Sequence, residues 1–282
     1  MTHKAAPLTL GYSPCPNDCF LFYALAHGRV GFEPVEVHLG DVEELNQLAL
    51  RGSLDVTKIS YHAYGHVSDR YVMLPSGGAL GRGVGPLIVT RQPLESLSGR
   101  SVAVPGGLTT ANLLLRLSQP DDLNYRELRY DLIMPAVAAG EVDAGLIIHE
   151  SRFTYAAHGL VKYLDLGEWW EATTGDLLPL GGVAALRTLG QARLSRLVEA
   201  LRASMNYAYE HPEEVASYVA EHAQELSREV RQRHIDLYVN SYSRDLGTEG
   251  RKAVAELFER ARLRGLLPEL PLPPIFEPPT AQ

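Results

Sequence analysis

Short apolar runs alternate with amphipathic runs along the first part of the chain. Leu8–Tyr12, Val35–Leu39 and residues 55–60 have the length of buried strands, and residues 18–27 and 42–50 carry apolar side chains at helical spacing. Strands that alternate with helices in this way are typical of parallel pairing through crossover helices. We therefore predict an α/β fold.

The same order of elements recurs later in the chain. Residues 52–56 (Gly-Ser-Leu-Asp-Val) follow a helical run and lead into a strand, and residues 140–144 (Gly-Glu-Val-Asp-Ala) do the same. Each match combines a glycine that ends a helix with an aspartate before a buried strand. Upstream of each, a strand, a proline-containing loop and a helix start follow one another, at residues 8–17 and again at 101–109. Two copies of one unit predict two similar lobes rather than a solenoid, which needs shorter and more numerous repeats.

The repeat also predicts how the chain is divided. We assign residues 1–91 and 183–282 to the first lobe and residues 92–182 to the second. Loops at the carboxyl ends of parallel strands form ligand crevices, so two such edges that face each other would form a cleft. Residues 189–265 are predicted to be nearly all helical, and the proline-rich tail, 268–282, is predicted to be extended.

His149 is the strongest candidate for chemistry. It directly follows the apolar run 144–148 and so lies at the end of a buried strand, next to the polar residues Glu150, Ser151 and Arg152. A neutral imidazole, with an ordinary pKa of about 6.5, is the side chain best suited to remove a proton near neutral pH. The alternative interpretation is a structural histidine that bonds to loop backbone.

Two further segments are suited to bind an anion. Thr109 and Thr110 follow a Pro-Gly-Gly loop and precede a helix, so free N–H groups, two hydroxyls and the positive helix end meet there. Lys58 lies in an apolar strand two residues before Ser60, where its ammonium group either enters the cleft or extends to the surface. An ordinary helix cap and a surface lysine are the structural alternatives.

Composition narrows the class of partner. The chain has 282 residues, of which 45% are apolar and 21% charged, enough for one large core or two smaller ones. Its formal net charge of −8 leaves no basic surplus for nucleic acid or for an anionic membrane surface. The sequence shows neither a signal peptide nor an apolar run long enough to span a membrane, so we expect a cytoplasmic protein.

No metal site is predicted. Cys15 and Cys19 are too few for a disulfide scaffold, or for a zinc site unless histidines join them. His62 and His66 are four residues apart but lack the third ligand of a zinc-hydrolase motif. The glycine-rich residues 81–85 also lack the spacing of a nucleotide-binding loop, so we expect them to let backbone approach a ligand.

Four longer motifs carry a resemblance to a known family. They are Gly-Tyr-Ser-Pro-Cys-Pro-Asn-Asp at residues 11–18, Thr-Lys-Ile-Ser-Tyr at 57–61, the glycine-rich segment 76–86, and residues 145–155. On these motifs the chain resembles the 1,4-dihydroxy-6-naphthoate synthase family of the futalosine route to menaquinone. The resemblance covers nearly the whole chain.

The resemblance implies a two-lobed, periplasmic-binding-protein-like (type II) α/β fold, in which each lobe is a mixed sheet flanked by helices and the ligand cleft lies between the lobes. It also implies a carbon–carbon lyase that converts cyclic dehypoxanthine futalosine to 1,4-dihydroxy-6-naphthoate, releases dihydroxyacetone and needs no cofactor. Carried over by position, His149 resembles the proton acceptor. The residues that resemble substrate-binding elements are Lys58, Ile59, Ser60, Thr109 and Thr110, and further site candidates are Asn17, Arg82 and Arg152.

Two other functions stay open at this point. Chorismate dehydratase, a sister enzyme of the same pathway, has this architecture and an anionic substrate. A cytoplasmic solute-binding protein is the alternative from another class, although the lack of a signal peptide speaks against it. In each case we expect a small carboxylated molecule as ligand, and oligomerisation is left open.

Overall fold

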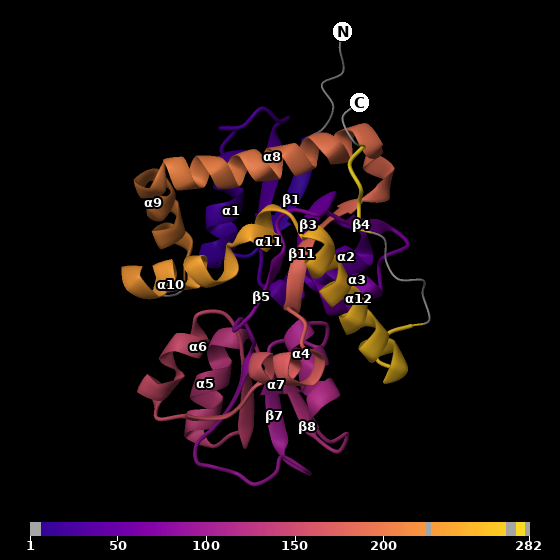
Figure 1. The fold of residues 1–282 in the computed structure, drawn as a ribbon. Helices are drawn as coiled ribbons and strands as arrows, with labels where there is room; N and C mark the ends of the chain where they lie inside the picture. The colour runs from indigo at the N-terminus through magenta and orange to yellow at the C-terminus, as the bar shows by residue number, and fades with distance from the viewer. Residues whose placement is uncertain (1–6, 224–226, 269–274, 280–282) are drawn as a thin grey trace.

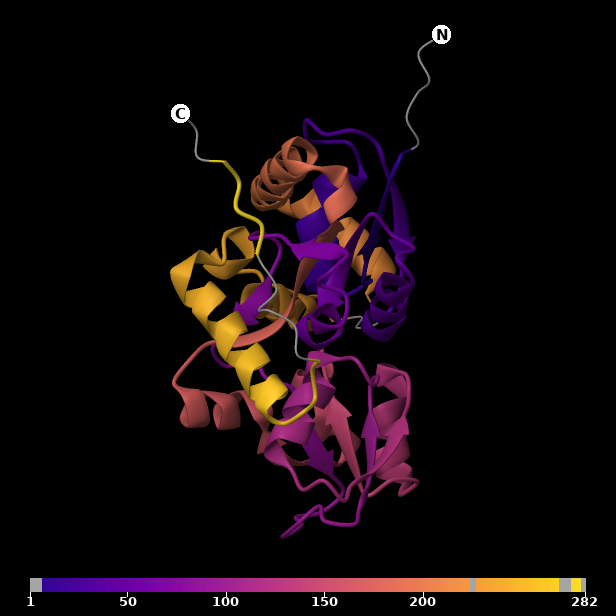
Figure 2. The same cartoon turned by 90° about the vertical axis from the view of Figure 1, so that its right-hand side faces the viewer.

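The computed structural model describes residues 7–223, 227–268 and 275–279, and it contains two mixed β-sheets flanked by helices. Figure 1 shows one sheet in the upper part of the molecule and the other in the lower part. Figure 2, turned by 90°, shows the same separation from the side. The predicted α/β class with two lobes is therefore confirmed.

The first lobe contains a six-stranded sheet in the order β2-β1-β3-β11-β4, with β5 paired to β11. Its strands are β1 (Leu8–Tyr12), β2 (Val35–Leu39), β3 (Val56–Ser60), β4 (Tyr71–Met73), β5 (Ala79–Gly81) and β11 (Leu178–Leu186). Its helices are α1 (Pro16–Ala26), α2 (Val42–Arg51), α3 (Tyr61–Gly65), α8 (Gln191–Glu210), α9 (Pro212–His222), α10 (Arg228–Tyr238), α11 (Ser241–Arg244) and α12 (Gly247–Leu263). A 3₁₀ turn, Arg187–Leu189, precedes α8.

The second lobe contains a five-stranded sheet in the order β10-β6-β9-β7-β8. Its strands are β6 (Leu87–Thr90), β7 (Ser101–Val104), β8 (Asn124–Glu127), β9 (Ala144–Ile147) and β10 (Val161–Asp165). Its helices are α4 (Thr110–Ser118), α5 (Tyr130–Ala139), α6 (Ser151–Thr154) and α7 (Leu166–Thr174), with a 3₁₀ turn at Tyr155–His158.

The internal repeat has a structural basis. The unit β1-α1-β2-α2-β3 of the first lobe is repeated as β7-α4-β8-α5-β9, and both units form parallel strands with the first strand in the centre. In each unit the aspartate of the repeat accepts hydrogen bonds from the start of the central strand. Asp55 accepts from the backbone N–H (2.9 Å) and hydroxyl (3.0 Å) of Thr9. Asp143 accepts from the same groups of Ser101, at 2.9 and 2.7 Å.

The helix-ending glycines of the repeat also adopt one conformation. Gly52 and Gly140 follow α2 and α5 with φ of 69° and 76°, in the left-handed region that glycine adopts without a steric penalty. The five-residue match therefore encodes a helix end, a turn and a bonded aspartate in both lobes.

Strands β6 and β11 make the two sheets mixed. Strand β11 runs antiparallel to β3, and β6 runs antiparallel to β9. The strand pairing places the boundaries between the lobes a few residues away from the predicted ones. Leu87–Thr90, predicted in the first lobe, belongs to the second sheet, and all of β11, predicted partly in the second lobe, belongs to the first sheet. The chain crosses between the sheets near residues 82–86 and 175–177. The repeat does not include these strands, so it could not indicate their partners.

Helix α1 is buried on all sides. Every residue from Pro16 to Leu25 is buried, and the apolar side chains are not confined to one face. Helices α8, α9 and α10 pack around it and cover this part of the first lobe (Figure 1). This helical region agrees with the prediction for residues 189–265, within the described part of the chain. The C-terminal helices therefore enclose the N-terminal motif of the sequence.

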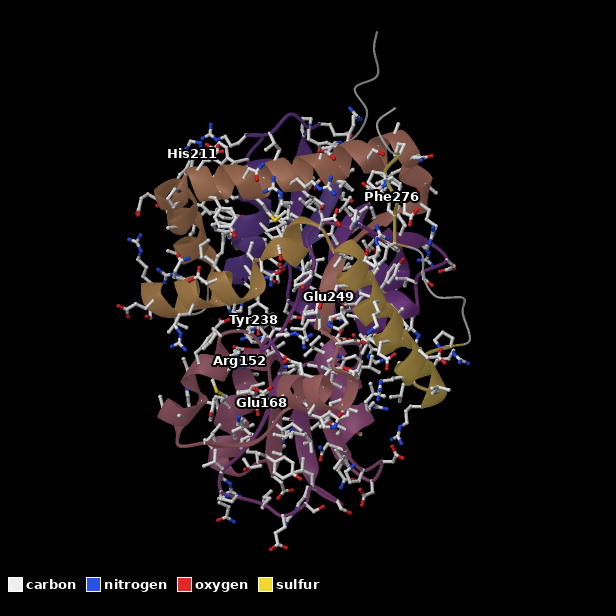
Figure 3. All side chains as sticks on the ribbon, in the orientation of Figure 1. Arg152, Glu168, His211, Tyr238, Glu249 and Phe276 are labelled. Carbon is white, nitrogen blue, oxygen red and sulfur yellow. The ribbon has the colours of Figure 1, made fainter. Side chains whose placement is uncertain are left out.

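The proline-rich tail lies partly outside the described residues, which omit 269–274 and 280–282. Ile275 forms a parallel bridge with Met73 of β4, and the N–H of Phe276 donates to the Met73 carbonyl at 2.8 Å. Figure 3 marks Phe276 at this place. Among the helices in the described ranges, none has the length and apolar character needed to cross a membrane.

Candidate active site between the lobes

A cavity of about 110 Å³ is lined by residues of both lobes. The first lobe supplies Lys58 and Ser60 from the end of β3, and His234 from α10. The second lobe supplies Thr109 and Thr110 at the start of α4, and His149 after β9. Most of the residues predicted from sequence are thus brought together at the carboxyl ends of parallel strands.

His149 has an unusual backbone conformation. Its φ of 57° is the one positive φ of a residue other than glycine in the described part of the chain. Histidine tolerates this region better than most side chains, but a strained φ of this kind costs on the order of 1–3 kcal/mol. Such strain persists only where surrounding contacts hold it, which is common in active sites.

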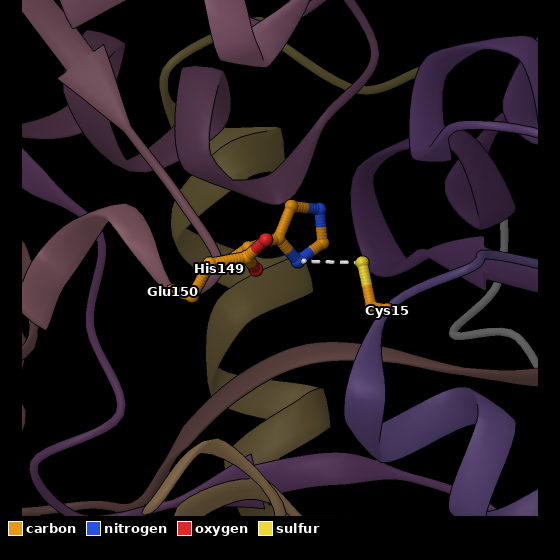
Figure 4. A group of neighbouring side chains, drawn as sticks. All are labelled: Cys15, His149 and Glu150. Atoms are coloured by element: carbon orange, nitrogen blue, oxygen red, sulfur yellow. Dashed lines mark hydrogen bonds between the residues drawn. The ribbon is translucent and has the colours of Figure 1, made fainter. Parts of the chain in front are cut away.

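A contact from the opposite lobe holds the His149 ring. Nδ1 of His149 lies 3.2 Å from Sγ of Cys15, the residue that precedes α1 (Figure 4). The Tyr130 ring packs edge-on against the imidazole, with 5.1 Å between the ring centroids. With Nδ1 facing the sulfur, the ring is held between the lobes, and Nε2 is the nitrogen left for a ligand.

Burial favours the neutral form of His149. Removal of the ring from water lowers its pKa below the ordinary value of 6.5, while the negative charges of Glu150, Asp18 and Asp41 oppose this shift. A neutral imidazole is the form that accepts a proton. In the tautomer that carries the proton on Nδ1 and donates it to the Cys15 sulfur, Nε2 has a free lone pair, and the neutral ring then suits a general base.

The same place could hold a metal ion. Donor atoms of Cys15, His149 and Glu150 all lie within 4.8 Å of one another (Figure 4), a group that the sequence analysis did not identify. Cysteine binds metal as a thiolate. Burial, and then the charges of Glu150 and Asp18, raise the pKa of the Cys15 thiol well above its ordinary value. Among the described residues this group supplies three donors, one fewer than a closed tetrahedral site, and we derive no chemistry from a metal here.

Lys58 is paired rather than free. Its Nζ donates to Oδ1 of Asp18 at 2.6 Å and to the Gly77 carbonyl at 3.2 Å, and both charged side chains are buried. Oδ2 of Asp18 accepts from the Ser13 hydroxyl at 2.8 Å, and Oδ1 also accepts from Nδ2 of Asn17 at 2.9 Å. Because Asp18 compensates the ammonium charge, Lys58 attracts an anion less strongly than the sequence alone indicated.

Ser60 and Ile59 also line the cavity, at the end of β3. The Ser60 hydroxyl accepts from Nδ2 of Asn46 at 3.2 Å, and the Ser60 N–H donates to Oδ1 of the same side chain at 3.0 Å. Asn46 on α2 was not identified from the sequence, since its role depends on a contact between a helix and a strand end.

The start of α4 forms the opposite wall. Thr109 is the helix cap, and its hydroxyl accepts from the N–H of Asn112 at 3.1 Å. The Thr110 hydroxyl donates to the Leu180 carbonyl at 2.6 Å. Both hydroxyls therefore serve the fold, which leaves the first two N–H groups of the helix, those of Thr110 and Ala111, and its positive end as the features suited to a carboxylate.

Of the three further candidates, only Asn17 lines the cavity. Arg82 is exposed and donates to the Gly175 carbonyl at 3.0 Å, where the two crossing segments of the chain meet. Arg152 donates to the Gly85 carbonyl at 2.6 Å and pairs with Asp165 at 3.3 Å. In this structure both arginines tie segments together and neither lines the cavity.

Two cavity residues on α10 were missed. His234 and Tyr238 are four residues apart, so they lie on one face of the helix, and both are buried. Figure 3 shows Tyr238 where the C-terminal helices meet the second lobe. A polar histidine among the apolar positions of an amphipathic helix was the available signal, but nothing in the sequence indicated that this helix reaches the cavity.

The family model for menaquinone biosynthesis matches residues 8–263. A protein of Thermus thermophilus named 1,4-dihydroxy-6-naphtoate synthase is 57% identical, over 94% of this chain and 98% of that protein. A protein of the same name from Streptomyces coelicolor is 49% identical, over 95% of this chain and 97% of its own length.

Solved structures support the fold. A protein from Archaeoglobus fulgidus superposes with a TM-score of 0.89 at 38% identity, over 94% of this chain and all of that chain. A Candida albicans protein described as having the generic periplasmic binding protein fold superposes with a TM-score of 0.65 at 16% identity, over 94% of this chain and 92% of its own, which shows the fold alone. The implied two-lobed architecture is thus confirmed, and the chain belongs to the menaquinone biosynthesis family.

Proposed function

We propose that this protein is a 1,4-dihydroxy-6-naphthoate synthase. It converts cyclic dehypoxanthine futalosine to 1,4-dihydroxy-6-naphthoate and dihydroxyacetone, as a carbon–carbon lyase of the futalosine pathway in the cytoplasm. The names of the two relatives support this activity. The observation that carries the proposal is His149, a positive-φ residue on the wall of a cavity between two lobes, where burial lowers the pKa of its imidazole.

In the proposed reaction His149 acts as the general base. It removes a proton from a hydroxyl of the sugar-derived part of the substrate, and the O–H electron pair forms a carbonyl as the carbon–carbon bond breaks. The electron pair of the broken bond passes into the ring system, which becomes aromatic. The proton on His149 can then return to the product. This retro-aldol type of cleavage uses no redox or metal group.

The substrate carboxylate is assigned to the start of α4. Thr109, Thr110 and Ala111 line the cavity there, and the first-turn N–H groups of a helix have no partner within the helix. On the other wall, Lys58, Ile59 and Ser60 contact the rest of the substrate. The carboxylate is then held at the start of α4 and the reacting hydroxyl at His149, both on the second lobe, and these two contacts fix the orientation of the substrate in the cavity.

A turnover assay tests the proposal. The purified protein is incubated with cyclic dehypoxanthine futalosine, and 1,4-dihydroxy-6-naphthoate and dihydroxyacetone are followed by mass spectrometry. We expect both products in equal amounts. Chorismate serves as the control substrate, and dehydration of chorismate without cleavage of the futalosine derivative would overturn the proposal. A ligand-dependent rise in melting temperature without turnover would instead indicate a binding protein.

A further inference from the structure

His234 presents a buried nitrogen that the proposed mechanism does not use. The side chain is 1% exposed and lines the cavity, and its Nδ1 has no hydrogen-bond partner among the described residues. A buried polar atom without a partner is unfavourable, so most such atoms in folded proteins are bonded. The exceptions call for an explanation, and a bound ligand is one.

The hydrogen bonds around His234 determine its tautomer. The Asp18 carboxylate only accepts, so the NH₂ group of Asn17 must face it, at 2.9 Å. The carbonyl oxygen of Asn17 then faces Nε2 of His234, at 2.8 Å. Nε2 therefore carries the proton and donates it to Asn17, which leaves Nδ1 with a free lone pair.

The surroundings keep His234 neutral. Burial lowers its pKa well below the ordinary value, and positive charge on His149, Lys58 or Arg152 lowers it further. Nδ1 is therefore a fixed acceptor. It suits a hydroxyl or an N–H of a ligand and repels a carboxylate, whose oxygens also carry lone pairs.

His234 also lies close to the base. The ring centroids of His149 and His234 are 6.2 Å apart, although the residues come from different lobes. A group with two hydroxyls bound between them could donate one hydrogen bond to each ring. Nδ1 itself is enclosed, so a ligand bonds it only where the surrounding side chains move.

We propose that His234 is a substrate-binding residue whose Nδ1 accepts a hydrogen bond from a hydroxyl in the sugar-derived part of the substrate. This inference rests on the proposed function. It places the polyhydroxylated end of the substrate between His149 and His234, and it keeps the carboxylate at the start of α4. His234 thereby orients the substrate and selects against a ligand with carboxylates at both ends.

Two matched variants test the inference. In His234→Gln the side-chain amide lies near the position of Nε2, so it keeps the bond to Asn17 and loses the acceptor at Nδ1. In His234→Asn the amide lies near the position of Nδ1, so it supplies an acceptor there and loses the bond to Asn17. We expect kcat/KM for cyclic dehypoxanthine futalosine to fall about tenfold or more in H234Q, equal to about 1.4 kcal/mol. The loss in H234N should be about threefold or less.

The melting temperature of each variant separates binding from folding. A substrate-binding role predicts that H234Q melts like the wild type and that KM rises more than kcat falls. Equal losses of activity in both variants, together with lower melting temperatures, would show a structural role and overturn the inference. H234Q with wild-type kcat/KM would overturn it as well. If the wild-type protein itself does not turn over the substrate, the proposed function fails and this inference fails with it.

Discussion

The two lobes share one scaffold and differ where the third strand of each unit ends. In the first lobe, β3 passes through an extended Ser60 directly into α3, and Asn46 of the same lobe bonds the Ser60 side chain and backbone. In the second lobe, β9 is followed by His149 at positive φ, and the ring is held by Cys15 of the first lobe. The residue at the end of β3 is therefore held by its own lobe, whereas His149 after β9 is held by a contact from the other lobe.

The helices that face the cavity differ in a related way. Thr109 caps α4 through its hydroxyl, whereas the equivalent residue before α1 is Cys15, which makes no side-chain cap bond. The sulfur of Cys15 contacts His149 instead. The duplicated position thus stabilises a helix in one lobe and positions the candidate base in the other. A repeated scaffold can keep its fold while one copy acquires a role in chemistry.

Replacement of His149 should have the largest effect. General base catalysis typically contributes about 10²–10⁴-fold to rate, so we expect kcat of His149→Ala to fall by that factor or more. Substrate binding, measured by calorimetry, should remain. The matched control is Tyr61→Phe, at the equivalent place in the first lobe, where the buried hydroxyl has no partner in the described residues. Tyr61→Phe removes a buried hydroxyl that has no partner to lose within the described ranges, so its stability should not fall and its kcat should match the wild type. Retained turnover in H149A would remove its proposed role.

The pH dependence of activity should follow the ionisation of His149. Burial lowers the pKa of His149 below 6.5, and the base must be neutral to accept a proton. Activity should therefore be full at pH 7 and fall only as the pH drops through a value below 6.5. The measurement is kcat/KM of the wild type from pH 5 to 8, with circular dichroism at each pH to exclude unfolding. A midpoint above 6.5 would contradict the effect of burial.

The helix cap at Thr109 should matter for stability in the second lobe. Loss of a threonine cap usually costs about 1 kcal/mol, and that is the loss of unfolding free energy we expect for Thr109→Ala in urea denaturation. Thr109→Ser keeps the hydroxyl and should recover most of this loss. Equal instability of the two variants would mean that the methyl group, rather than the cap bond, stabilises this helix.

The paired aspartates should make similar and smaller contributions. Asp143→Asn and Asp55→Asn each weaken hydrogen bonds to the central strand, and we expect each to lower stability by about 1 kcal/mol or less at pH 7. Hydrogen bonds from Ser101 lower the pKa of Asp143 below its ordinary 3.8. Its stabilisation is therefore present above that value and lost as the pH falls through the lowered pKa.

Acid denaturation tests whether the contribution of Asp143 to stability is lost at low pH. As the pH falls below 3.8, the wild type should lose more stability than Asp143→Asn, which has no carboxylate to protonate at this position. Identical acid profiles for the two proteins would show that Asp143 does not contribute. If Asp143→Asn and Asp55→Asn lose unequal amounts of stability at pH 7, the two aspartates make the same hydrogen bonds but contribute differently to the stability of their lobes.

Local features of the fold could be read from the sequence. The strands Leu8–Tyr12, Val35–Leu39 and Val56–Ser60, the helix start at Thr109, and the glycines that end α2 and α5 depend on residues close together in the chain. Such features follow from periodicity and capping, which short segments contain.

The remaining features depend on partners far apart in the chain. Neither the antiparallel pairing of β11 with β3 nor the approach of Cys15 to His149 leaves a local pattern. His234 reaches the cavity only because α10 packs against α1. The pairing of Lys58 with Asp18 likewise became visible only in three dimensions, and it changed the expected role of the lysine.

Arg82 was expected in the site, and its position has a mechanical consequence. Two covalent segments join the lobes, and the Arg82 bond to Gly175 fastens them to each other. The Gly83 N–H also donates to Glu171 of α7 at 2.7 Å, which ties the first segment to the second lobe. A single linker would let the lobes twist freely. Two fastened linkers restrict torsion and leave bending about the line that joins them as the softest degree of freedom. Any opening of the cavity along that coordinate would bring His149 back to the same side of the first lobe each time it closes.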